Sequence, residues 1–272
     1  MMPKISVIIP VYNSAKWITA CVDSVLAQTM TEYECILVDN CGQDDSIAQV
    51  RHHLKGKPEE GQFVFAATET NNGPGAARNL GLSMAKGKYV AFLDADDFVE
   101  PEMYKVLYEN AECWDADISS AAAVLDYEDG RENSFMYNPH VGNGEITPSN
   151  RKILLNRFVS NFTTCLFRRD WLIHSGIIFP DSRSGEDSAF MGCCYLSASR
   201  IAQTDEVFYH YRIHAESISH KKRMWRGAEK RKAFDAMFQY ARNKGLMREY
   251  WWQLYSIYIR KALLTPIIEV LK

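Results

Sequence analysis

Residues 1–100 contain short, continuous apolar runs that alternate with segments of helical periodicity. Ile5–Ile9, Tyr33–Val38 and Tyr89–Leu93 are mostly apolar or aromatic, which is the pattern of strands buried on both faces of a sheet. Phe63–Ala67 is expected to be a further strand. Strands that alternate with helices across short loops predict an α/β fold with a mostly parallel sheet and right-handed crossovers.

After Pro101 the alternation becomes less regular, and from Lys221 onward the pattern is helical throughout. We therefore expect one domain over residues 1–219 and a helical extension over residues 220–272. The further elements expected are helices over residues 102–113 and 153–159, strands over 116–125, 164–167 and 200–211, and hairpins or a loop over 126–148.

The composition is that of a globular protein. The chain has 272 residues, of which 47% are hydrophobic and 24% are charged, with a net charge of −3. This charge argues against a nucleic-acid binder that works by overall charge, so no nucleic-acid partner is expected. Neither the h-region of a secretory signal nor an apolar run of the roughly 20 residues that span a bilayer occurs. A cytoplasmic protein is therefore expected.

The strand predicted at Tyr89–Leu93 runs directly into an acidic segment, Asp94-Ala95-Asp96-Asp97. Open α/β sheets bind their ligands at the carboxyl ends of the strands. Carboxylates one residue apart at such a position can share a divalent cation, because Mg²⁺ and Mn²⁺ prefer oxygen ligands and substrate phosphates. The alternative is a solvated acidic turn that caps the next helix, since Asp is also a good N-cap residue.

Polar or flexible residues follow the other predicted strands at the same edge of the sheet. Asp39 can accept hydrogen bonds from a ribose or a base edge, or it can cap the helix that follows near Ser46. Gly73 allows close approach of a ligand to the backbone. Arg78 lies in the first turn of the next helix, where the macrodipole favours acids, which suggests that it binds a diphosphate or an acidic partner. Neither GxGxxG nor GxxxxGK[ST] occurs.

Two downstream segments carry further candidates. Glu186 and Asp187 precede an apolar helical stretch, where they are either first-turn acids that stabilise the helix or the source of a general base. His214 follows a predicted strand and is either an ordinary surface or core residue or a ligand of a cation at the acidic segment.

Together these segments resemble the family-2 glycosyltransferases, inverting enzymes with the GT-A fold that use nucleotide-diphospho-sugars. The resemblance extends from Ile5 to about Ser219. At Asn40-Cys41-Gly42 the sequence departs from the Asp-Gly-Ser of many members, which implies a retuned nucleotide loop. The matching segments are Ser6-Val7-Ile8-Ile9-Pro10-Val11-Tyr12-Asn13, Ile36-Leu37-Val38-Asp39, Asn72-Gly73 with Ala76-Ala77-Arg78-Asn79, Phe92-Leu93-Asp94-Ala95-Asp96-Asp97, and Gly185-Glu186-Asp187.

The resemblance implies a GT-A-type, mostly parallel sheet flanked by helices. Its Rossmann-like nucleotide-sugar half would cover about residues 1–100 and its acceptor half about residues 101–219, followed by the helical C-terminal extension. It also implies a function: transfer of a sugar, with UDP-sugars as the commonest donors, to a hydroxyl of a glycan or lipid-linked acceptor in surface polysaccharide synthesis. Mn²⁺ or Mg²⁺ is the implied cofactor.

The resemblance further implies a role for each matching residue. Asp187 would deprotonate the acceptor hydroxyl. Asp96 would bind the metal that bridges the phosphates, with His214 as a candidate further ligand. The implied donor-site residues are Pro10, Val11, Tyr12, Asn13 and Asp39 for base and ribose, Gly73 and Arg78 along the nucleotide and diphosphate, and Asp94 with Ala95 near the ribose or a metal-bound water.

Two other functions stay open from the residues alone. A nucleotidyltransferase would want a Gly-rich, basic loop after the first strand, where this chain has Val11-Tyr12-Asn13-Ser14. A non-catalytic nucleotide-sugar-binding module would need neither the Asp96 site nor the distant Asp187.

The C-terminal extension has two interpretations. Residues 221–232 are rich in Lys and Arg, and residues 247–264 are rich in aromatic and aliphatic side chains. These segments are either a helix pair packed on the catalytic domain with basic outer faces, or an interfacial element that touches the inner face of the membrane. The apolar segment 267–271 leaves a homodimer open.

Overall fold

The computed structural model describes residues 2–214 and 226–264. A ten-stranded sheet forms its centre, in the order β3-β2-β1-β4-β9-β6-β10-β5, with β7 paired to β6 and β8 paired to β10. The strands are β1 (Ile5–Val11), β2 (Tyr33–Asp39), β3 (Phe63–Ala67), β4 (Tyr89–Phe92), β5 (Phe98–Val99), β6 (Ile118–Tyr127), β7 (Ser134–Met136), β8 (Gly144–Glu145), β9 (Cys165–Arg168) and β10 (Arg200–Ile213).

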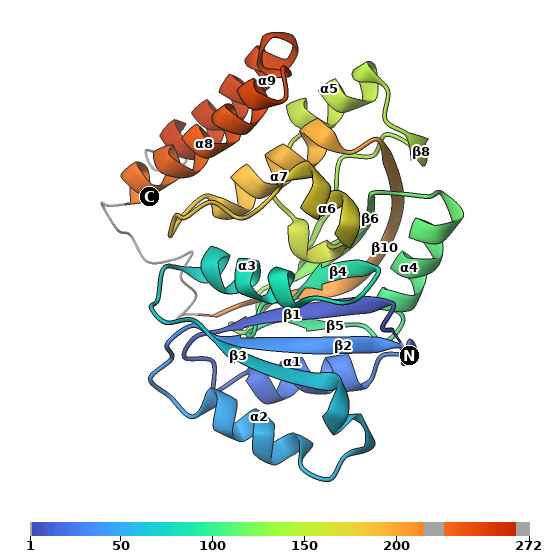
Figure 1. The fold of residues 1–272 in the computed structure, drawn as a ribbon, viewed down its shortest axis with the longest axis vertical. Helices are drawn as coiled ribbons and strands as arrows, with labels where there is room; N and C mark the ends of the chain where they lie inside the picture. The colour runs from blue at the N-terminus through green and yellow to red at the C-terminus, as the bar shows by residue number, and fades with distance from the viewer. Residues whose placement is uncertain (1, 215–225, 265–272) are drawn as a thin grey trace.

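Helices cover both faces of this sheet (Figure 1). The α-helices are α1 (Ile18–Leu26), α2 (Ser46–Leu54), α3 (Pro74–Met84), α4 (Met103–Cys113), α5 (Pro148–Asn156), α6 (Arg169–Ser175), α7 (Glu186–Ser197), α8 (Arg226–Asn243) and α9 (Met247–Tyr258). Short helical turns η1 (Pro58–Gln62), η2 (Phe162–Thr164) and η4 (Ile259–Leu264) complete the described chain.

The first four strands confirm the predicted parallel arrangement. β1 pairs in parallel with β2 and β4, and β2 pairs in parallel with β3. Val11 lies opposite Asp39, and Ile8 lies opposite Phe92. The loops that follow β1, β2 and β4 therefore meet at one edge of the sheet, as the sequence predicts.

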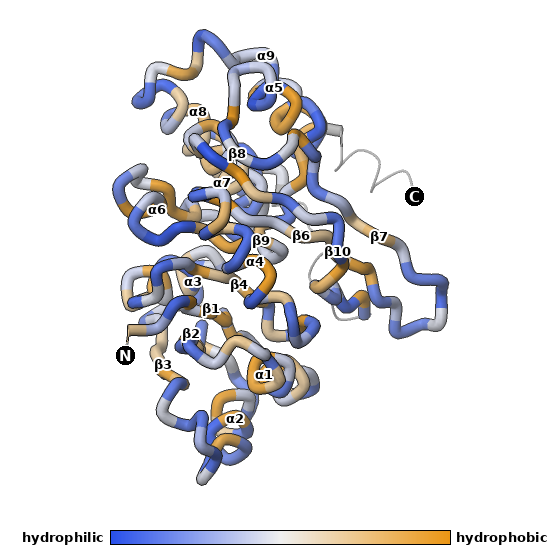
Figure 2. The backbone as a smooth tube through the Cα atoms, turned by 90° about the vertical axis from the view of Figure 1, so that its right-hand side faces the viewer, coloured by the Kyte–Doolittle hydropathy of each residue, from blue (hydrophilic) through white to orange (hydrophobic). Residues whose placement is uncertain are grey.

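The second half of the sheet is mixed, and the α/β class is confirmed. β6 and β10 form a long parallel pair, whereas β9 runs antiparallel to both β4 and β6. β7 pairs antiparallel with β6, so part of the polar stretch 126–148 forms the predicted hairpin. In Figure 2 this hairpin projects from one side of the molecule with a hydrophilic turn.

Each strand of the parallel half supplies both hydrophobic cores, because successive side chains point to opposite faces. Ile8 and Phe92 pack in the core that contains α3 and α7, whereas Ile9 and Leu93 pack in the core that contains α1 and α4. Residues of α8 and α9 belong to the first of these cores (Figure 1). The C-terminal helices therefore pack on the rest of the fold. The boundary predicted at residue 219 lies outside the described residues.

Several elements differ from the sequence-based expectations. The helix expected over residues 153–159 is α5, which begins earlier because the Thr147 hydroxyl accepts a hydrogen bond from the Asn150 amide and Pro148 occupies the first turn. The short elements β5 and α6 were not predicted, since two or seven residues carry too little periodicity to be recognised. No helix within residues 2–214 and 226–264 has the length and apolarity needed to cross a bilayer.

Helix α3 lies unusually close to β1. A Cβ atom at Gly81 would come within 2.4 Å of Cγ2 of Ile8, so only glycine fits this contact. Because Arg78 also belongs to α3, the short distance between α3 and β1 determines how deeply the Arg78 side chain is buried at the edge of the sheet.

We expect Gly81→Ala to lower the free energy of unfolding by about 1–3 kcal/mol, because the added methyl group overpacks the contact with Ile8. Chemical denaturation measures this difference. Gly61→Ala is the matched control, since a Cβ there meets no atom within 4 Å. Equal stability of the two variants would contradict the inferred close packing.

Candidate active site

The three carboxylates that follow β4 have different environments. Asp97 is buried, with an exposed fraction of 2%. Its carboxylate accepts a hydrogen bond from the Tyr209 hydroxyl at 2.5 Å and another from the Arg212 amide at 2.8 Å. Asp97 therefore ties the acidic segment to β10.

Asp96 and His214 are brought together although 118 residues separate them. Nε2 of His214 lies 3.1 Å from Oδ2 of Asp96. The His214 side chain is only 4% exposed, whereas that of Asp96 is 36% exposed. Burial and the neighbouring Asp94 raise the pKa of Asp96, and the contact with His214 opposes that rise. Within the described residues, no group of three or more His, Cys, Asp and Glu side chains is arranged to hold a metal ion.

Arg78 lies at the centre of a buried charge network. Its Nη2 atom is 2.6 Å from Oδ1 of Asp94, and its Nη1 atom is 3.5 Å from Oε1 of Glu186. The guanidinium also lies over the rings of Phe162 and Phe179, at 4.7 and 5.3 Å from their centroids. Arg78 thus links the acidic segment to the start of α7. In this arrangement its charge is matched by two carboxylates of the protein itself.

Glu186 and Asp187 begin α7 but point to different environments. Burial raises the pKa of Glu186 to about 7, the Asp187 carboxylate adds to the rise, and Arg78 opposes it. Asp187 is partly exposed and makes no side-chain hydrogen bond with another described residue. Of the two acids, Asp187 is therefore the one whose carboxylate is accessible to a substrate.

The loops after β1 and β2 are joined by side-chain hydrogen bonds. Asn13 has a φ of 51°, and its side-chain oxygen accepts a hydrogen bond from the Gln43 amide at 2.7 Å. Oδ1 of Asp39 accepts a hydrogen bond from the Gly42 amide at 2.9 Å. Tyr12 is 43% exposed at the same edge. Pro10, Val11 and Ala95 lie in the adjoining backbone, and Ala95 is buried.

Asn40 connects the loops after β2 and β3, and no motif in the sequence indicates this role. It is 3% exposed, and its amide nitrogen donates to Oδ1 of Asn71 and to the carbonyl of Gly73, both at 3.2 Å. Its side-chain oxygen accepts from the Thr68 hydroxyl at 3.0 Å. The next residue, Cys41, has a φ of 60°, which costs a non-glycine residue roughly 1–2 kcal/mol. In this chain, Asn40 therefore joins the loops after β2 and β3, and Cys41 takes a backbone conformation that favours glycine.

Gly73 contacts the loop that precedes α7, at Ser182 and Arg183. It has a φ of 94°, and a Cβ there would lie 3.2 Å from the carbonyl oxygen of Ser182. Arg183 donates from Nη2 to the carbonyl of Asn71 at 3.0 Å. The loop before α7 thus packs against the loop after β3, although more than a hundred residues separate them.

Helix α8 holds the loop that precedes Glu186 and Asp187. The Glu229 carboxylate accepts a hydrogen bond from the Arg183 amide at 2.7 Å, and the Glu229 carbonyl accepts from the Ser182 hydroxyl at 2.9 Å. Lys232 pairs with Asp181 at 2.9 Å. Helix α8 thus fixes the loop that precedes the candidate base, Asp187. No motif in the sequence predicted this role for the C-terminal extension.

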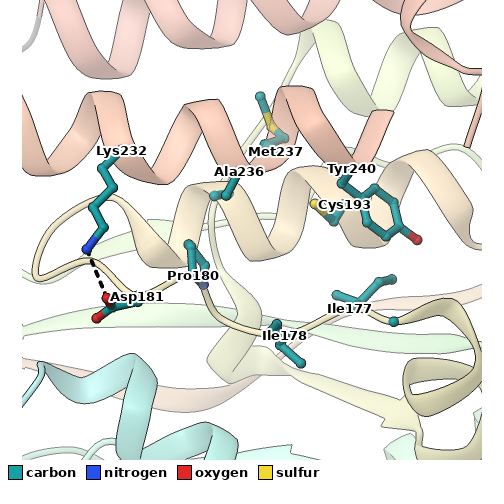
Figure 3. Close-up of a pocket in the computed structure, with 11 residues that line it drawn as sticks. Ile177, Ile178, Pro180, Asp181, Cys193, Lys232, Ala236, Met237 and Tyr240 are labelled. Carbon is teal, nitrogen blue, oxygen red and sulfur yellow. Dashed lines mark hydrogen bonds and ion pairs between the residues drawn. The ribbon is translucent and has the colours of Figure 1, made fainter. Parts of the chain in front are cut away.

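A cavity of about 310 Å³ lies between α8 and the loop that joins α6 to α7 (Figure 3). Its walls are mostly apolar and include Ile177, Ala189 and Met237, with the Asp181–Lys232 pair at one end (Figure 3). None of the predicted site residues lines it. The candidate site is therefore the strand edge and not this cavity.

The sequence model of glycosyl transferase family 2 matches residues 6–176. The chain belongs to this family. Among its relatives, the uncharacterized glycosyltransferase EpsJ of Bacillus subtilis (strain 168) is 30% identical over 223 residues, which are 80% of this chain and 64% of EpsJ. The poly(ribitol-phosphate) beta-N-acetylglucosaminyltransferase TarS of Staphylococcus aureus (strain MW2) is 30% identical over 77% of this chain and 35% of TarS. The chain thus spans less than two thirds of the length of these relatives.

The fold likeness agrees with the family assignment. The crystal structure of S. aureus TarS residues 1–349 in complex with UDP-GlcNAc matches with a TM-score of 0.73 and 26% identity. The match covers 93% of this chain and 73% of that chain. The GT-A-type fold expected from the resemblance is therefore confirmed.

Glu186 generates a pH-dependent prediction. The unfolded chain releases this proton near pH 4.5, whereas the folded protein keeps it until about pH 7. Between these values the folded state binds more protons, so the stability that Glu186 contributes is lost as the pH rises. From about pH 5 to about pH 8, Glu186→Gln should therefore gain stability relative to the unmutated protein, by on the order of 1–3 kcal/mol.

Chemical denaturation at several pH values tests this. The matched control is Glu109→Gln, which changes an exposed acid of α4. Its stability difference from the unmutated protein should stay constant with pH. A constant difference for Glu186→Gln as well would contradict the raised pKa.

Proposed function

We propose that this protein is a metal-dependent inverting glycosyltransferase. It moves a sugar from a nucleotide-diphospho-sugar, with UDP-sugars as the expected donors, to a hydroxyl of a glycan or lipid-linked acceptor in surface polysaccharide synthesis. The observation that carries the proposal is the Arg78 network, which joins the acidic end of β4 to the start of α7, where Asp187 lies. The likeness to TarS, whose crystal structure contains UDP-GlcNAc, supports the donor class.

The donor lies along the strand edge in this proposal. The base and ribose are held by Asp39 and by the segment Pro10-Val11-Tyr12-Asn13. The loops that carry these residues meet beside the acidic segment. Arg78 acts beside the diphosphate through Asp94, whose carboxylate it pairs with and holds in place.

Asp96 and His214 fit the partial donor set of a cation that is bound together with a diphosphate. They offer one carboxylate oxygen and one imidazole nitrogen 3.1 Å apart. Mg²⁺ and Mn²⁺ commonly complete such a set with waters and substrate phosphates. A cation held there supplies Lewis-acid stabilisation of the negative charge that grows on the departing diphosphate.

Asp187 is the proposed general base. Its carboxylate accepts the proton of the acceptor hydroxyl while that oxygen attacks the anomeric carbon, and the bond to the diphosphate breaks on the opposite side. This in-line displacement inverts the anomeric centre. The carboxylate must come within about 3 Å of the attacking oxygen. Glu186 does not compete for this proton, because it is buried against Arg78.

The two alternative functions predict different products. A nucleotidyltransferase would release pyrophosphate from a nucleoside triphosphate and a sugar phosphate, and a binding module would release nothing. Incubation of the full chain with UDP-GlcNAc, UDP-glucose and GDP-mannose in the presence of Mn²⁺, with detection of the free nucleoside diphosphate, distinguishes the three.

We expect Asp187→Asn to reduce the rate of UDP release from the preferred UDP-sugar by at least about 100-fold, because the amide cannot accept the proton. UDP binding, measured by calorimetry, should change by less than about threefold, since Asp187 does not contact the nucleotide in this proposal. Asp235→Asn is the matched control, because Asp235 is an exposed acid of α8 outside the candidate site. Near-normal turnover of Asp187→Asn would remove Asp187 from the mechanism.

A peripheral membrane contact through α9 is a second proposal. Trp251, Trp252 and Tyr255 are 52%, 60% and 44% exposed, and Ile259 and Leu263 continue the apolar face into η4. Tryptophan and tyrosine beside cationic side chains suit the headgroup layer of an anionic bilayer. Arg248 and Arg260 are exposed on the same segment.

We expect the full chain to co-sediment with vesicles that contain anionic lipid, and the double variant Trp251→Ser, Trp252→Ser to lose most of this binding. Trp114→Ser is the matched control, because Trp114 is exposed on α4. Deletion of α8 and α9 is less suitable, since Phe234 and Met237 belong to the core. Absence of co-sedimentation together with a dimer in light scattering would instead assign this face to a second copy of the chain.

A further inference from the structure

The imidazole of His214 lies against the indole of Trp17. The two ring centroids are 3.9 Å apart, with 31° between the ring planes. Both residues are almost fully buried, with whole-residue exposed fractions of 6% for His214 and 5% for Trp17. Trp17 directly precedes α1, so the loop after β1 supplies a flat apolar support for the histidine that follows β10.

Glu128 holds this pair from two sides. Its Oε1 atom accepts a hydrogen bond from Nε1 of Trp17 at 3.2 Å. Its backbone amide donates to the carbonyl of Ile213 at 3.2 Å. One residue thus fixes both the ring that supports His214 and the residue that precedes it in the chain. Lys16 pairs with the other carboxylate oxygen of Glu128 at 3.5 Å.

These contacts leave one ring nitrogen of His214 directed at the acidic segment. Nε2 lies 3.1 Å from Asp96 Oδ2, while the indole restricts rotation and tilt of the imidazole. Groups that surround a metal-binding histidine commonly determine its orientation, and their loss typically weakens metal affinity or activity by about 10–100-fold.

We propose that Trp17 and Glu128 are positioning residues that hold His214 in the orientation required to bind a divalent cation with Asp96. This inference rests on the cation site in the proposed function. It adds Trp17, which directly precedes α1, and Glu128, which directly follows β6, and neither belongs to a motif of the sequence. A purely structural role for the pair would lower stability and leave the cation affinity of the folded protein unchanged.

The test measures Mn²⁺ affinity of the full chain in the presence of UDP, by electron paramagnetic resonance of free Mn²⁺. Trp17→Leu removes the aromatic support, and Glu128→Leu removes the hydrogen-bond acceptor. We expect each to raise the Mn²⁺ dissociation constant about 10-fold or more. Glu128→Gln should stay within about threefold of the unmutated protein, because its amide oxygen can still accept the indole N–H.

Lys16→Met is the matched control. It removes the ion pair with Glu128 and the cation that lies 4.8 Å from the centroid of the Trp17 ring. The indole hydrogen bond and the contact of the indole with His214 stay in place, so its Mn²⁺ affinity should not change. Thermal unfolding and UDP binding without metal are measured on every variant, so that only folded protein is compared. Trp17→Phe, which keeps an aromatic face, provides a folded variant if Trp17→Leu is unstable, and a raised dissociation constant is again expected because it cannot donate to Glu128.

The outcomes distinguish failure of the positioning role from failure of the cation site on which it rests. Asp96→Ala and His214→Ala are included for this purpose. If both weaken Mn²⁺ binding while the Trp17 and Glu128 variants do not, the positioning role is overturned and the cation site stands. If the unmutated protein binds no Mn²⁺ with UDP, or if Asp96→Ala and His214→Ala have no effect, the cation site and the positioning role are both overturned. Weakened binding in the Trp17 and Glu128→Leu variants, with Lys16→Met and Glu128→Gln normal, supports the proposal.

Discussion

The buried guanidinium of Arg78 is the interaction on which the rest of the site depends. A charge at 4% exposure is costly unless nearby groups replace its hydration. Asp94, Glu186 and the rings of Phe162 and Phe179 do so from three different parts of the chain. Loss of Asp94, the partner at 2.6 Å, would cost about 3–5 kcal/mol, because the Arg78 charge would stay buried without its main counter-charge.

This network constrains both sides of the site at once. After β4, it fixes one carboxylate oxygen of Asp94, while Asp97 is separately fixed by Tyr209. At the start of α7, it draws Glu186 inward, and the helical geometry of α7 then places Asp187 on a different face of the same turn. The contact requires α3 to lie close to β1, which the absence of a Cβ at Gly81 permits.

The C-terminal helices contribute to this geometry as well as to the core. α8 binds the loop before Glu186 through Glu229, and its apolar face packs in the same core as α3 and α7. The composition of this extension predicted either a helix pair packed on the domain or an element that touches a membrane. Its helices do pack on the rest of the fold, and α8 also holds the loop that leads to the candidate base. These contacts are tertiary, since Arg183 and Ser182 lie 46 and 47 positions before Glu229 in the sequence.

Much of the fold was predictable because it depends on local patterns. β3 was predicted with its observed bounds, and β1, β2 and β4 with ends shifted by two residues or fewer, since continuous apolar runs are local features. For the candidate site, the sequence predicted that the ends of neighbouring strands carry its polar residues and meet at one edge of the sheet. The partners of these residues were not predictable, as Asn40 shows: nothing adjacent in the sequence indicates that its amide joins the loops after β2 and β3.

By itself, the sequence determined the alternation of strands and helices, the polar residues that end each strand, and thereby the edge of the sheet that carries the candidate site. Only the tertiary structure decided how neighbouring carboxylates differ: Asp94 pairs with Arg78, Asp96 meets His214, and Asp97 is buried under Tyr209. The reason is physical. Strand formation follows from side-chain pattern within a few residues, whereas a carboxylate's environment depends on residues up to 118 positions away that only the folded sheet brings into contact.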